Sequence, residues 1–356
     1  MYRTSGSFLA LTLVWFSLSC ANVLAEIRPM SGKIVPGFEP IDKAVQEFME
    51  KIGCQAATVA VSRDGQTVYS RGYGWSDQAR KKPTPPDALM RIASVTKPIT
   101  AAAVKNAIRA QQLSLDTKVF ELIAAKISGG KTADPRFKRI TVGQLLEHKG
   151  GWDAGASFDP MFRTKQIEQE LRLRGPATPE NVIKYMLNQP LQFTPGEKTV
   201  YSNFGYCILG RVLEKAMKKP YADCIQETIC KPLGINDIRL GHGALIWRDP
   251  REVWYPVAEN AVPIDVMDAP AGLIASAPAL CQFLEAYWIG GDPRLQGQRG
   301  GNWTFFGSLP GTTALVRQRE DGFSVAVLLN GRRDKHFKED DPLLKQAIDE
   351  AIEKLK

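Results

Sequence analysis

Cysteine and histidine are scarce in this chain, whose 356 residues include six cysteines and three histidines. The sequence contains no Cys-x-x-Cys pair and no histidine-rich spacing of the kind that binds zinc. We therefore expect the protein to work without a metal ion or another cofactor. Basic and aromatic residues do not alternate in the manner typical of nucleic-acid-binding surfaces, so we also expect no nucleic-acid partner.

Long apolar runs are missing beyond the N-terminus, so the mature sequence predicts no membrane-spanning helix. At the N-terminus, Arg3 precedes an apolar run at residues 8–18, and small residues follow around Val23-Leu24-Ala25. This pattern is typical of a secretory signal peptide, which we assign to residues 1–25. We predict an exported protein that is periplasmic or secreted.

The sequence does not determine which cysteines form disulfide bonds. Cleavage after Ala25 leaves five cysteines, and an odd number leaves at least one unpaired. Cys224 and Cys230 could pair if the helix between them ends early, but on one regular helix their side chains point apart. Cys20 could instead carry a lipid anchor. We favour that alternative less, because Leu18 lies one residue too close to the cysteine.

The chain carries a modest excess of positive charge. The formal net charge is +8, and cleavage lowers it by one, because Arg3 is the one charged residue among residues 1–25. Such an excess fits a soluble surface, an anionic substrate or peripheral contact with a cell-envelope polymer. The fractions of hydrophobic residues (44%) and charged residues (24%) are those of an ordinary globular protein.

Strand signals lie at both ends of the chain, and a mainly helical block lies between them. Strand-like segments lie at residues 56–62, 67–70, 304–309, 314–318 and 323–330, and Asp64-Gly65 and Asp321-Gly322 are hairpin turn signals between two pairs of them. Helical periodicity predicts helices at residues 41–52 and 342–355. We therefore predict an α/β (α+β) fold in which both chain ends build one central antiparallel sheet flanked by helices, beside an all-helical second lobe. The predicted single catalytic domain comprises residues 26–356, with an α/β lobe at 26–115 and 270–356 and a helical lobe at 116–269.

Ser94 and Lys97 lie where a loop is predicted to enter a helix. Residues three apart share a face of a helix, so the hydroxyl and the amine can meet. A serine hydroxyl becomes a good nucleophile when an adjacent base removes its proton. The positive end of the helix dipole also favours negative charge developing there. Ser-x-x-Lys occurs often by chance at exposed helix starts, so this interpretation depends on partners elsewhere in the chain.

Two further motifs supply such partners: Tyr201-Ser202-Asn203 before a predicted helix, and Gly307-Ser308 on a late predicted strand. With Ser94-x-x-Lys97 they resemble the serine β-lactamase and penicillin-binding protein superfamily, most closely its class C β-lactamase and esterase branch. The resemblance covers nearly the whole mature chain. Segments in matching order and spacing support it, namely Gly72-Tyr73-Gly74, residues 140–148, Pro195-Gly196 and Pro232-Leu233-Gly234.

The resemblance implies a role for each motif residue. Ser94 attacks a carbonyl and becomes acylated, while Lys97 and Tyr201 share the proton transfers. The base is either a neutral Lys97 or a Tyr201 phenolate beside a cationic Lys97, and the sequence leaves both open. Asn203 orients Lys97 and donates its amide to the substrate. The backbone N–H groups of Ser94 and Ser308 form the oxyanion hole.

Each of these residues also has an ordinary structural interpretation. Taken alone, Tyr201 would be a core aromatic residue and Asn203 a helix cap. His148, at the end of a predicted helix, is more simply explained as a structural residue than as a catalytic one. The order of the three motifs along the chain is what favours a catalytic site.

One position departs from the pattern of the superfamily. The third motif usually begins with lysine or histidine, followed by a small residue and glycine, whereas this chain has Phe305-Phe306-Gly307. Phenylalanine carries no charge and donates no hydrogen bond, so the cation that would hold a substrate carboxylate is missing. We therefore expect Phe305 to favour a neutral, partly apolar ester. Arg332 or Arg333, just beyond the final predicted strand, could replace that charge.

The sequence thus predicts an exported serine hydrolase that cleaves carboxylic esters or related small acyl compounds through a Ser94 acyl-enzyme. The alternative enzyme is a DD-peptidase or weak β-lactamase that acts on cell-wall-like substrates. The alternative from another class is a non-catalytic binding or sensor module of the cell envelope. Neither the natural acyl group nor the oligomeric state follows from the sequence.

Overall fold

The computed structural model describes residues 28–123, 134–295 and 297–355. The signal peptide predicted at residues 1–25, with Cys20, lies outside the described residues. Among the described residues, no helix combines the length and the apolar character needed to cross a membrane.

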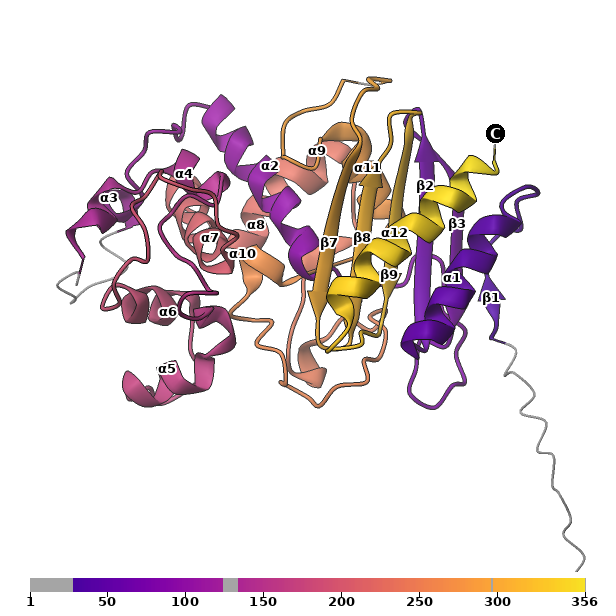
Figure 1. Ribbon diagram of the computed structural model, residues 1–356, viewed down its shortest axis with the longest axis horizontal. Helices are drawn as coiled ribbons and strands as arrows, with labels where there is room; N and C mark the ends of the chain where they lie inside the picture. The colour runs from indigo at the N-terminus through magenta and orange to yellow at the C-terminus, as the bar shows by residue number, and fades with distance from the viewer. Residues whose placement is uncertain (1–27, 124–133, 296, 356) are drawn as a thin grey trace, which may run out of the picture.

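A six-stranded antiparallel sheet forms the centre of the structure (Figure 1). Its strand order is β1-β3-β2-β9-β8-β7, so strands from both chain ends share one sheet, joined where β2 pairs with β9. This arrangement confirms the predicted fold class. The strands are β1 (Met30–Ser31), β2 (Ala56–Arg63), β3 (Gln66–Gly74), β7 (Trp303–Leu309), β8 (Thr312–Gln318) and β9 (Phe323–Leu329).

The β2–β3 hairpin shows why these strands form where the sequence predicts them. Residues 56–62 of β2 are all buried, as expected for a strand covered on both faces. The chain then reverses at Asp64-Gly65, where both residues have positive φ angles of 51° and 84°. Such angles match the tight turn of a hairpin and are easily adopted by glycine. β3 continues past the predicted end at residue 70, because its second half still pairs with the start of β2.

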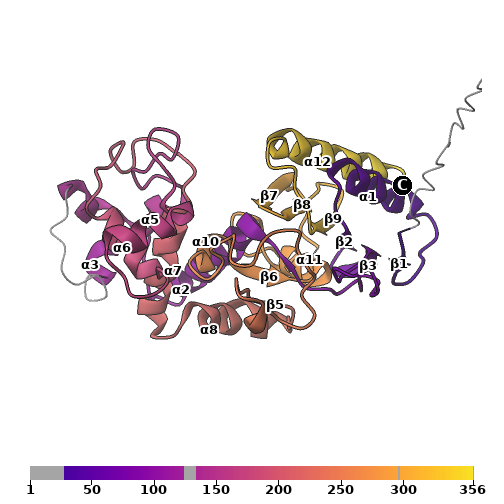
Figure 2. The same cartoon turned by 90° about the horizontal axis from the view of Figure 1, so that it is seen from below.

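Helices cover both faces of this sheet (Figure 2). One face packs against two helices from opposite chain ends, which lie side by side. Those helices are α1 (Glu39–Ile52) and α12 (Phe337–Glu353). The other face packs against α11 (Ala277–Ala286), and α2 (Thr96–Arg109) belongs to the same apolar cluster. Side chains alternate accordingly, since Val59 and Val61 pack with α1 and α12 whereas Ala60 packs with α11.

A group of helices from the middle of the chain lies at the end of the molecule remote from α1 and α12 (Figure 1). They are α3 (Val119–Ile123), α4 (Val142–Leu146), α5 (Thr164–Glu170), α6 (Pro179–Met186) and α7 (Asn203–Met217). The chain then returns toward the sheet through α8 (Tyr221–Ile225), α9 (Lys231–Leu233) and α10 (Asp268–Ala271). α7 packs against α2 and α10, so it joins this lobe to the rest of the molecule.

A second, small sheet was not expected from the sequence. Its antiparallel strands are β4 (Met90–Arg91), β6 (Leu273–Ala275) and β5 (Ile238–Leu240), in that order. Each has only two or three residues, too few to show an alternating pattern. β5 falls inside residues 116–269, so the range assigned to the helical lobe is not helical throughout. The small sheet helps to position Ser94, because β4 leads directly into the turn that carries this residue.

The cysteines in the described part of the chain are all free and buried. Cys224 and Cys230 lie on one continuous helical run, made of α8, a π-helical turn at Gln226–Cys230 and α9. This result agrees with the alternative in which their side chains point apart.

β7 is an edge strand that packs tightly against the turn containing Ser94. The strand contacts the 3₁₀ turn Ala93–Val95, and a Cβ atom added to Gly307 would lie 2.1 Å from the carbonyl oxygen of Ile92. No side chain fits in that space. Gly307 therefore allows the edge of the sheet to approach the backbone just before Ser94.

We predict that Gly307→Ala displaces this turn, because the new methyl group meets backbone rather than a movable side chain. The expected cost is roughly 1–3 kcal/mol of unfolding free energy, together with loss of any activity that depends on Ser94. Chemical denaturation measures the first effect and an activity assay the second. The control is Gly175→Ala, where an added Cβ has no neighbour within 4 Å and the expected change is within about 0.5 kcal/mol. Equal behaviour of the two variants would contradict the role given to Gly307.

Candidate active site

Ser94 lies in the 3₁₀ turn Ala93–Val95 between β4 and α2. α2 begins at Thr96, so Ser94 precedes the helix by two residues instead of occupying its first turn. The turn begins at Ala93, whose φ of +46° lies in the left-handed region. That conformation costs a non-glycine residue about 1–3 kcal/mol and is typical of functional sites. The fully buried Ala93 packs in the main apolar cluster, which holds the turn in this shape.

Lys97 is buried and its amine is surrounded by three oxygen atoms. Nζ lies 2.6 Å from Asn203 Oδ1, 2.9 Å from the carbonyl oxygen of Pro270 and 3.2 Å from Ser94 Oγ. The first two oxygens can only accept, so two N–H groups of Lys97 point at them. In a neutral amine the remaining position is the lone pair, which then faces Ser94 Oγ. This geometry allows Lys97 to take the proton of Ser94.

Tyr201 approaches Ser94 from the loop that leads into α7. Its hydroxyl donates to Ser94 Oγ over 2.7 Å, and its ring centroid lies 4.7 Å from Lys97 Nζ. The residue is 46% exposed, so one side of the ring borders open space while the hydroxyl meets Ser94. The structure thus brings together the amine and the phenol, which lie 104 positions apart in the sequence numbering, at one serine oxygen.

His148 holds the segment that carries Tyr201. Its carbonyl oxygen accepts from the N–H of Val200 over 3.0 Å, and its Nδ1 accepts from the N–H of Ser202 over 3.2 Å. The imidazole ring also lies 4.8 Å from the Tyr201 ring. The two hydrogen bonds hold the residues on either side of Tyr201. His148 therefore has the structural role expected from the sequence, and this role is to position Tyr201.

Asn203 connects Lys97 to a residue that sequence reasoning missed. Its Oδ1 accepts from Lys97, as expected, but its Nδ2 donates to Asp159 Oδ2 over 2.6 Å. Asp159 lies in the long polar loop after Trp152, and no motif marks it. The only signal in the sequence is Asp159-Pro160, which predicts a turn and not a site.

The environment shifts the pKa values of the groups around Ser94. Burial lowers the pKa of Lys97 to about 7, and the charge of Asp159 opposes this shift. Burial raises the pKa of Tyr201 to about 12, although its hydrogen bond with Ser94 acts in the other direction. Burial, followed by the charge of Lys97, lowers the pKa of His148 to about 4. At neutral pH the neutral form of Lys97 is therefore far more accessible than the phenolate of Tyr201.

The two faces of β7 differ. Phe305 packs with the apolar cluster that contains Ile92, and Gly307 faces the same side, whereas Phe306 packs with α1 and α12. Ser308 shares the face of Phe306, since side chains alternate along a strand. The Ser308 N–H stays a prediction as an oxyanion donor. An edge strand does leave alternate N–H groups free of its neighbour.

Neither arginine that could replace the missing cation lies on the face of Phe305. Arg332 Nη1 donates to Ser308 Oγ over 3.3 Å, and the same guanidinium binds Asp334 and lies over the Phe337 ring of α12. Arg333 pairs with Asp340. Both therefore belong to the α12 side of β7. The face of β7 nearest Ser94 is apolar at the position where the superfamily usually has a cation.

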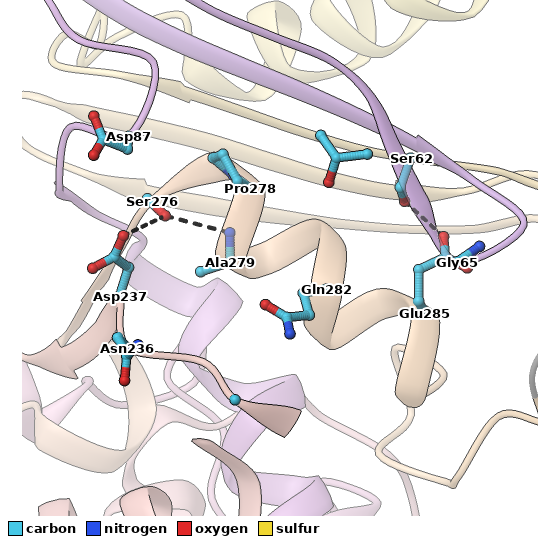
Figure 3. Close-up of a pocket in the computed structure, with 12 residues that line it drawn as sticks. Ser62, Gly65, Asp87, Asn236, Asp237, Ser276, Pro278, Ala279, Gln282 and Glu285 are labelled. Atoms are coloured by element: carbon cyan, nitrogen blue, oxygen red, sulfur yellow. Dashed lines mark hydrogen bonds between the residues drawn. The ribbon is translucent and has the colours of Figure 1, made fainter. Parts of the chain in front are cut away.

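No group of metal-binding side chains was found in the described part of the chain. A separate hollow of about 360 Å³ lies elsewhere in the molecule (Figure 3). It is lined by polar residues such as Asp237 and Glu285 and contains none of the residues around Ser94. Glu285 is already engaged, because it accepts from the Ser62 hydroxyl and the Gly65 N–H. The hollow is therefore distinct from the candidate site.

A sheet built from both chain ends, a helical lobe, and a serine that meets a lysine and a tyrosine define the architecture of a class of serine hydrolases. The chain belongs to the beta-lactamase family, whose model matches residues 41–335.

Individual relatives carry different names. The probable fimbrial assembly protein FimD, serogroup H1, of Dichelobacter nodosus is 35% identical over 199 residues, which cover 55% of this chain and 45% of that protein. Esterase EstB of Burkholderia gladioli is 30% identical over 228 residues, covering 62% and 53%. The chain thus spans about half the length of these curated relatives. A solved D-amino acid amidase from Ochrobactrum anthropi shares the fold, with a TM-score of 0.65 at 19% identity over 87% of this chain and 99% of that one.

We predict that hydrolysis of a short ester by Ser94 rises with pH through about 7 and then levels off, because protonated Lys97 cannot accept the proton of Ser94. The measurement is kcat/KM for a short p-nitrophenyl ester as a function of pH. Lys97→Arg keeps a cation that stays protonated, so its kcat/KM should fall by about 10²- to 10⁴-fold at every pH. A wild-type profile that is flat between about pH 5 and 9 would instead favour a base other than Lys97.

Proposed function

We propose that this protein is a serine hydrolase that cleaves carboxylic esters or related small acyl compounds through a covalent Ser94 intermediate. The observation that carries the proposal is the convergence of the Lys97 amine and the Tyr201 hydroxyl on Ser94 Oγ, at 3.2 and 2.7 Å. A nucleophile with a base and an acid in contact is the arrangement that acyl transfer requires. A non-catalytic binding module would have no need for a buried amine held next to a serine.

The acylation step follows from the contacts of Ser94. Lys97 takes the hydroxyl proton as Ser94 Oγ bonds to the substrate carbonyl carbon, and the carbonyl electron pair moves onto its oxygen. Two backbone N–H groups, those of Ser94 and Ser308, are proposed to stabilise this oxyanion. When the tetrahedral species collapses, the bond to the leaving alkoxide breaks. The Tyr201 hydroxyl, protonated because of its high pKa, donates a proton to the alkoxide, and Lys97 resupplies that proton.

The second step regenerates the enzyme. A water molecule attacks the acyl carbon of the Ser94 ester. The neutral Lys97 accepts the proton of this water, either directly or by way of the Tyr201 hydroxyl. The bond to Ser94 Oγ breaks, Ser94 regains a proton, and the acid is released. The sum is ester plus water giving acid plus alcohol, with no redox change and no group left on the protein.

The apolar face of β7 supports esters over substrates with a free carboxylate. Phe305 occupies the position of the usual cation, and both Arg332 and Arg333 lie on the α12 side of the strand. A carboxylate bound beside Phe305 would lose water without gaining a charged partner, which is unfavourable. Cell-wall-like amides and β-lactams are therefore the less favoured substrates.

We also propose that the protein is exported, which rests on the charged start, apolar run and small residues at 1–25. The basic net charge fits peripheral contact with anionic cell-envelope polymers.

The first test of this function is labelling with a fluorophosphonate probe, which we predict adds one group to Ser94. Intact mass and peptide mapping locate the adduct, and Ser94→Ala should remove it together with turnover of p-nitrophenyl esters. Ser157→Ala, in an exposed loop, is a matched control that should label normally. Absence of an adduct under conditions that label a known esterase would favour the binding module.

A second test concerns Phe305. We predict that Phe305→His increases hydrolysis of nitrocefin or of a D-alanyl peptide relative to esters. The gain should be greater at about pH 6 than at about pH 8, because only the imidazolium can bind a carboxylate. Phe306→His places the same residue on the opposite face of β7 and should give no such gain. Efficient nitrocefin hydrolysis by the wild-type protein would show that the role of Phe305 was misjudged and would favour the peptidase or β-lactamase alternative.

A further inference from the structure

The Asp159 carboxylate lies at the end of a hydrogen-bonded chain that leads to Ser94. Asp159 Oδ2 accepts from Asn203 Nδ2 over 2.6 Å, Asn203 Oδ1 accepts from Lys97 Nζ over 2.6 Å, and Nζ lies 3.2 Å from Ser94 Oγ. Of these three contacts, the two made by Asn203 are the shortest. In the described contacts Asp159 reaches Ser94 through Asn203 and Lys97 and not directly.

The carboxylate decides which way the Asn203 amide points. The oxygen and the nitrogen of an amide occupy similar positions, so a rotation by 180° exchanges them at little steric cost. A rotated Asn203 would direct its NH₂ group at the Lys97 amine, which already uses its N–H groups as donors. Burial raises the pKa of Asp159, while its hydrogen bonds from Asn203 and Met161 and the charge of Lys97 oppose that shift. The ionised carboxylate can only accept, so it is satisfied only when Nδ2 faces it and Oδ1 faces Lys97.

The place of Asp159 in the loop gives the carboxylate a fixed position. Its other oxygen, Oδ1, accepts from the N–H of Met161 over 3.0 Å and caps the 3₁₀ turn Pro160–Phe162. Pro160 and Met161 are buried, so this turn is anchored in the helical lobe. The two oxygens thus have separate tasks, since one fixes the loop and the other fixes Asn203.

We propose that Asp159 is a positioning residue of the Ser94 site, which locks the Asn203 amide so that its oxygen holds Lys97 with the lone pair directed at Ser94. This proposal rests on the proposed function of Ser94 and deepens it. It also predicts an electrostatic effect, because a carboxylate near Lys97 favours the protonated amine. The other groups around the amine are the Tyr201 and Tyr206 rings, at 4.7 and 5.7 Å, and His148, whose low pKa keeps it neutral.

The decisive variant is Asp159→Ser. Serine keeps a capping oxygen for the Met161 N–H but is too short to hold Asn203 and carries no charge. We expect kcat for a p-nitrophenyl ester to fall by about 10- to 100-fold, the effect of losing a hydrogen bond to a charged group, with KM little changed. The acid limb of the pH profile should move to lower pH, because loss of the negative charge eases deprotonation of Lys97. If Asp159 only caps the turn, the variant will match the wild type in kcat and in pH profile.

A double-mutant cycle tests whether the effect runs through Asn203. Asn203→Ala alone should reduce kcat, and adding Asp159→Ser to it should reduce kcat little further, since the positioned amide is already gone. Independent, multiplicative losses would overturn the proposal. Asp153→Ser is the control, because Asp153 caps a turn of the same loop through the Gly155 N–H but pairs with Lys198 and not with Asn203 or Lys97 in the described contacts. It should retain wild-type kcat.

Two further measurements keep the outcomes separate. If Asp159→Ser does not fold, as judged by its denaturation curve, the exchange Asp159→Asn with Asn203→Asp restores a hydrogen bond between the two positions with the donor reversed. The exchange places a carboxylate next to the Lys97 amine, so the acid limb of the pH profile should move to higher pH. An acid limb at the wild-type pH would count against the proposal. Labelling of wild-type Ser94 tests the proposed function itself. A wild type that is labelled, beside an Asp159→Ser variant that reacts equally fast, would refute the role of Asp159 alone.

Discussion

The burial of one amine is the constraint on which the rest of the site depends. Lys97 is 1% exposed, and a lysine removed from water without partners would simply lose its proton or destabilise the fold. Here two carbonyl oxygens, one from Asn203 and one from Pro270, satisfy two N–H groups and leave one position of the nitrogen facing Ser94. The same burial that costs folding free energy brings the pKa of the amine to about 7. Stability and reactivity of the site thus have one physical origin.

This constraint explains why the chain has to join distant segments at one point. Lys97 lies on α2, Asn203 begins α7, and Pro270 lies on α10, and these three helices pack against one another. β7 packs against the turn that carries Ser94, because Gly307 allows its backbone to lie close to the Ile92 carbonyl. A buried network of this kind is favourable only when each polar atom has a partner, so a shift of any one element would leave an unsatisfied group in the core. The interface between the lobes is therefore specified by polar contacts as much as by apolar packing.

Much of this arrangement was predictable, and the reasons for the exceptions are physical. Strand-like segments and the hairpin turns at Asp64-Gly65 and Asp321-Gly322 predicted the main sheet, and two short motifs pointed to Ser94, Lys97 and Tyr201. The small sheet was missed because strands of two or three residues have no measurable periodicity. Asp159 was missed because its role depends on an irregular loop that folds back onto α7, and loop geometry leaves no repeating signal in the sequence. The side of β7 on which Arg332 lies also required the structure, since position after a strand does not determine the face.

In the proposed function, the side chains that transfer protons and the side chain that selects the substrate lie on different elements of the fold. The proposed proton transfers involve side chains before and on α2 and from the segment that begins α7, and hydrogen bonds connect these side chains. β7 contributes the proposed oxyanion donor, the Ser308 N–H, from its backbone and the apolar character of Phe305 from its side chains. The Phe305 side chain has no hydrogen bond to Lys97 or Tyr201 in the contacts described for these residues. Two sites far enough apart to share no partner contribute nearly additively. A change at Phe305 should therefore alter which acyl compounds are accepted while the reactivity of Ser94 stays the same, so a single scaffold can serve several substrates through one strand edge.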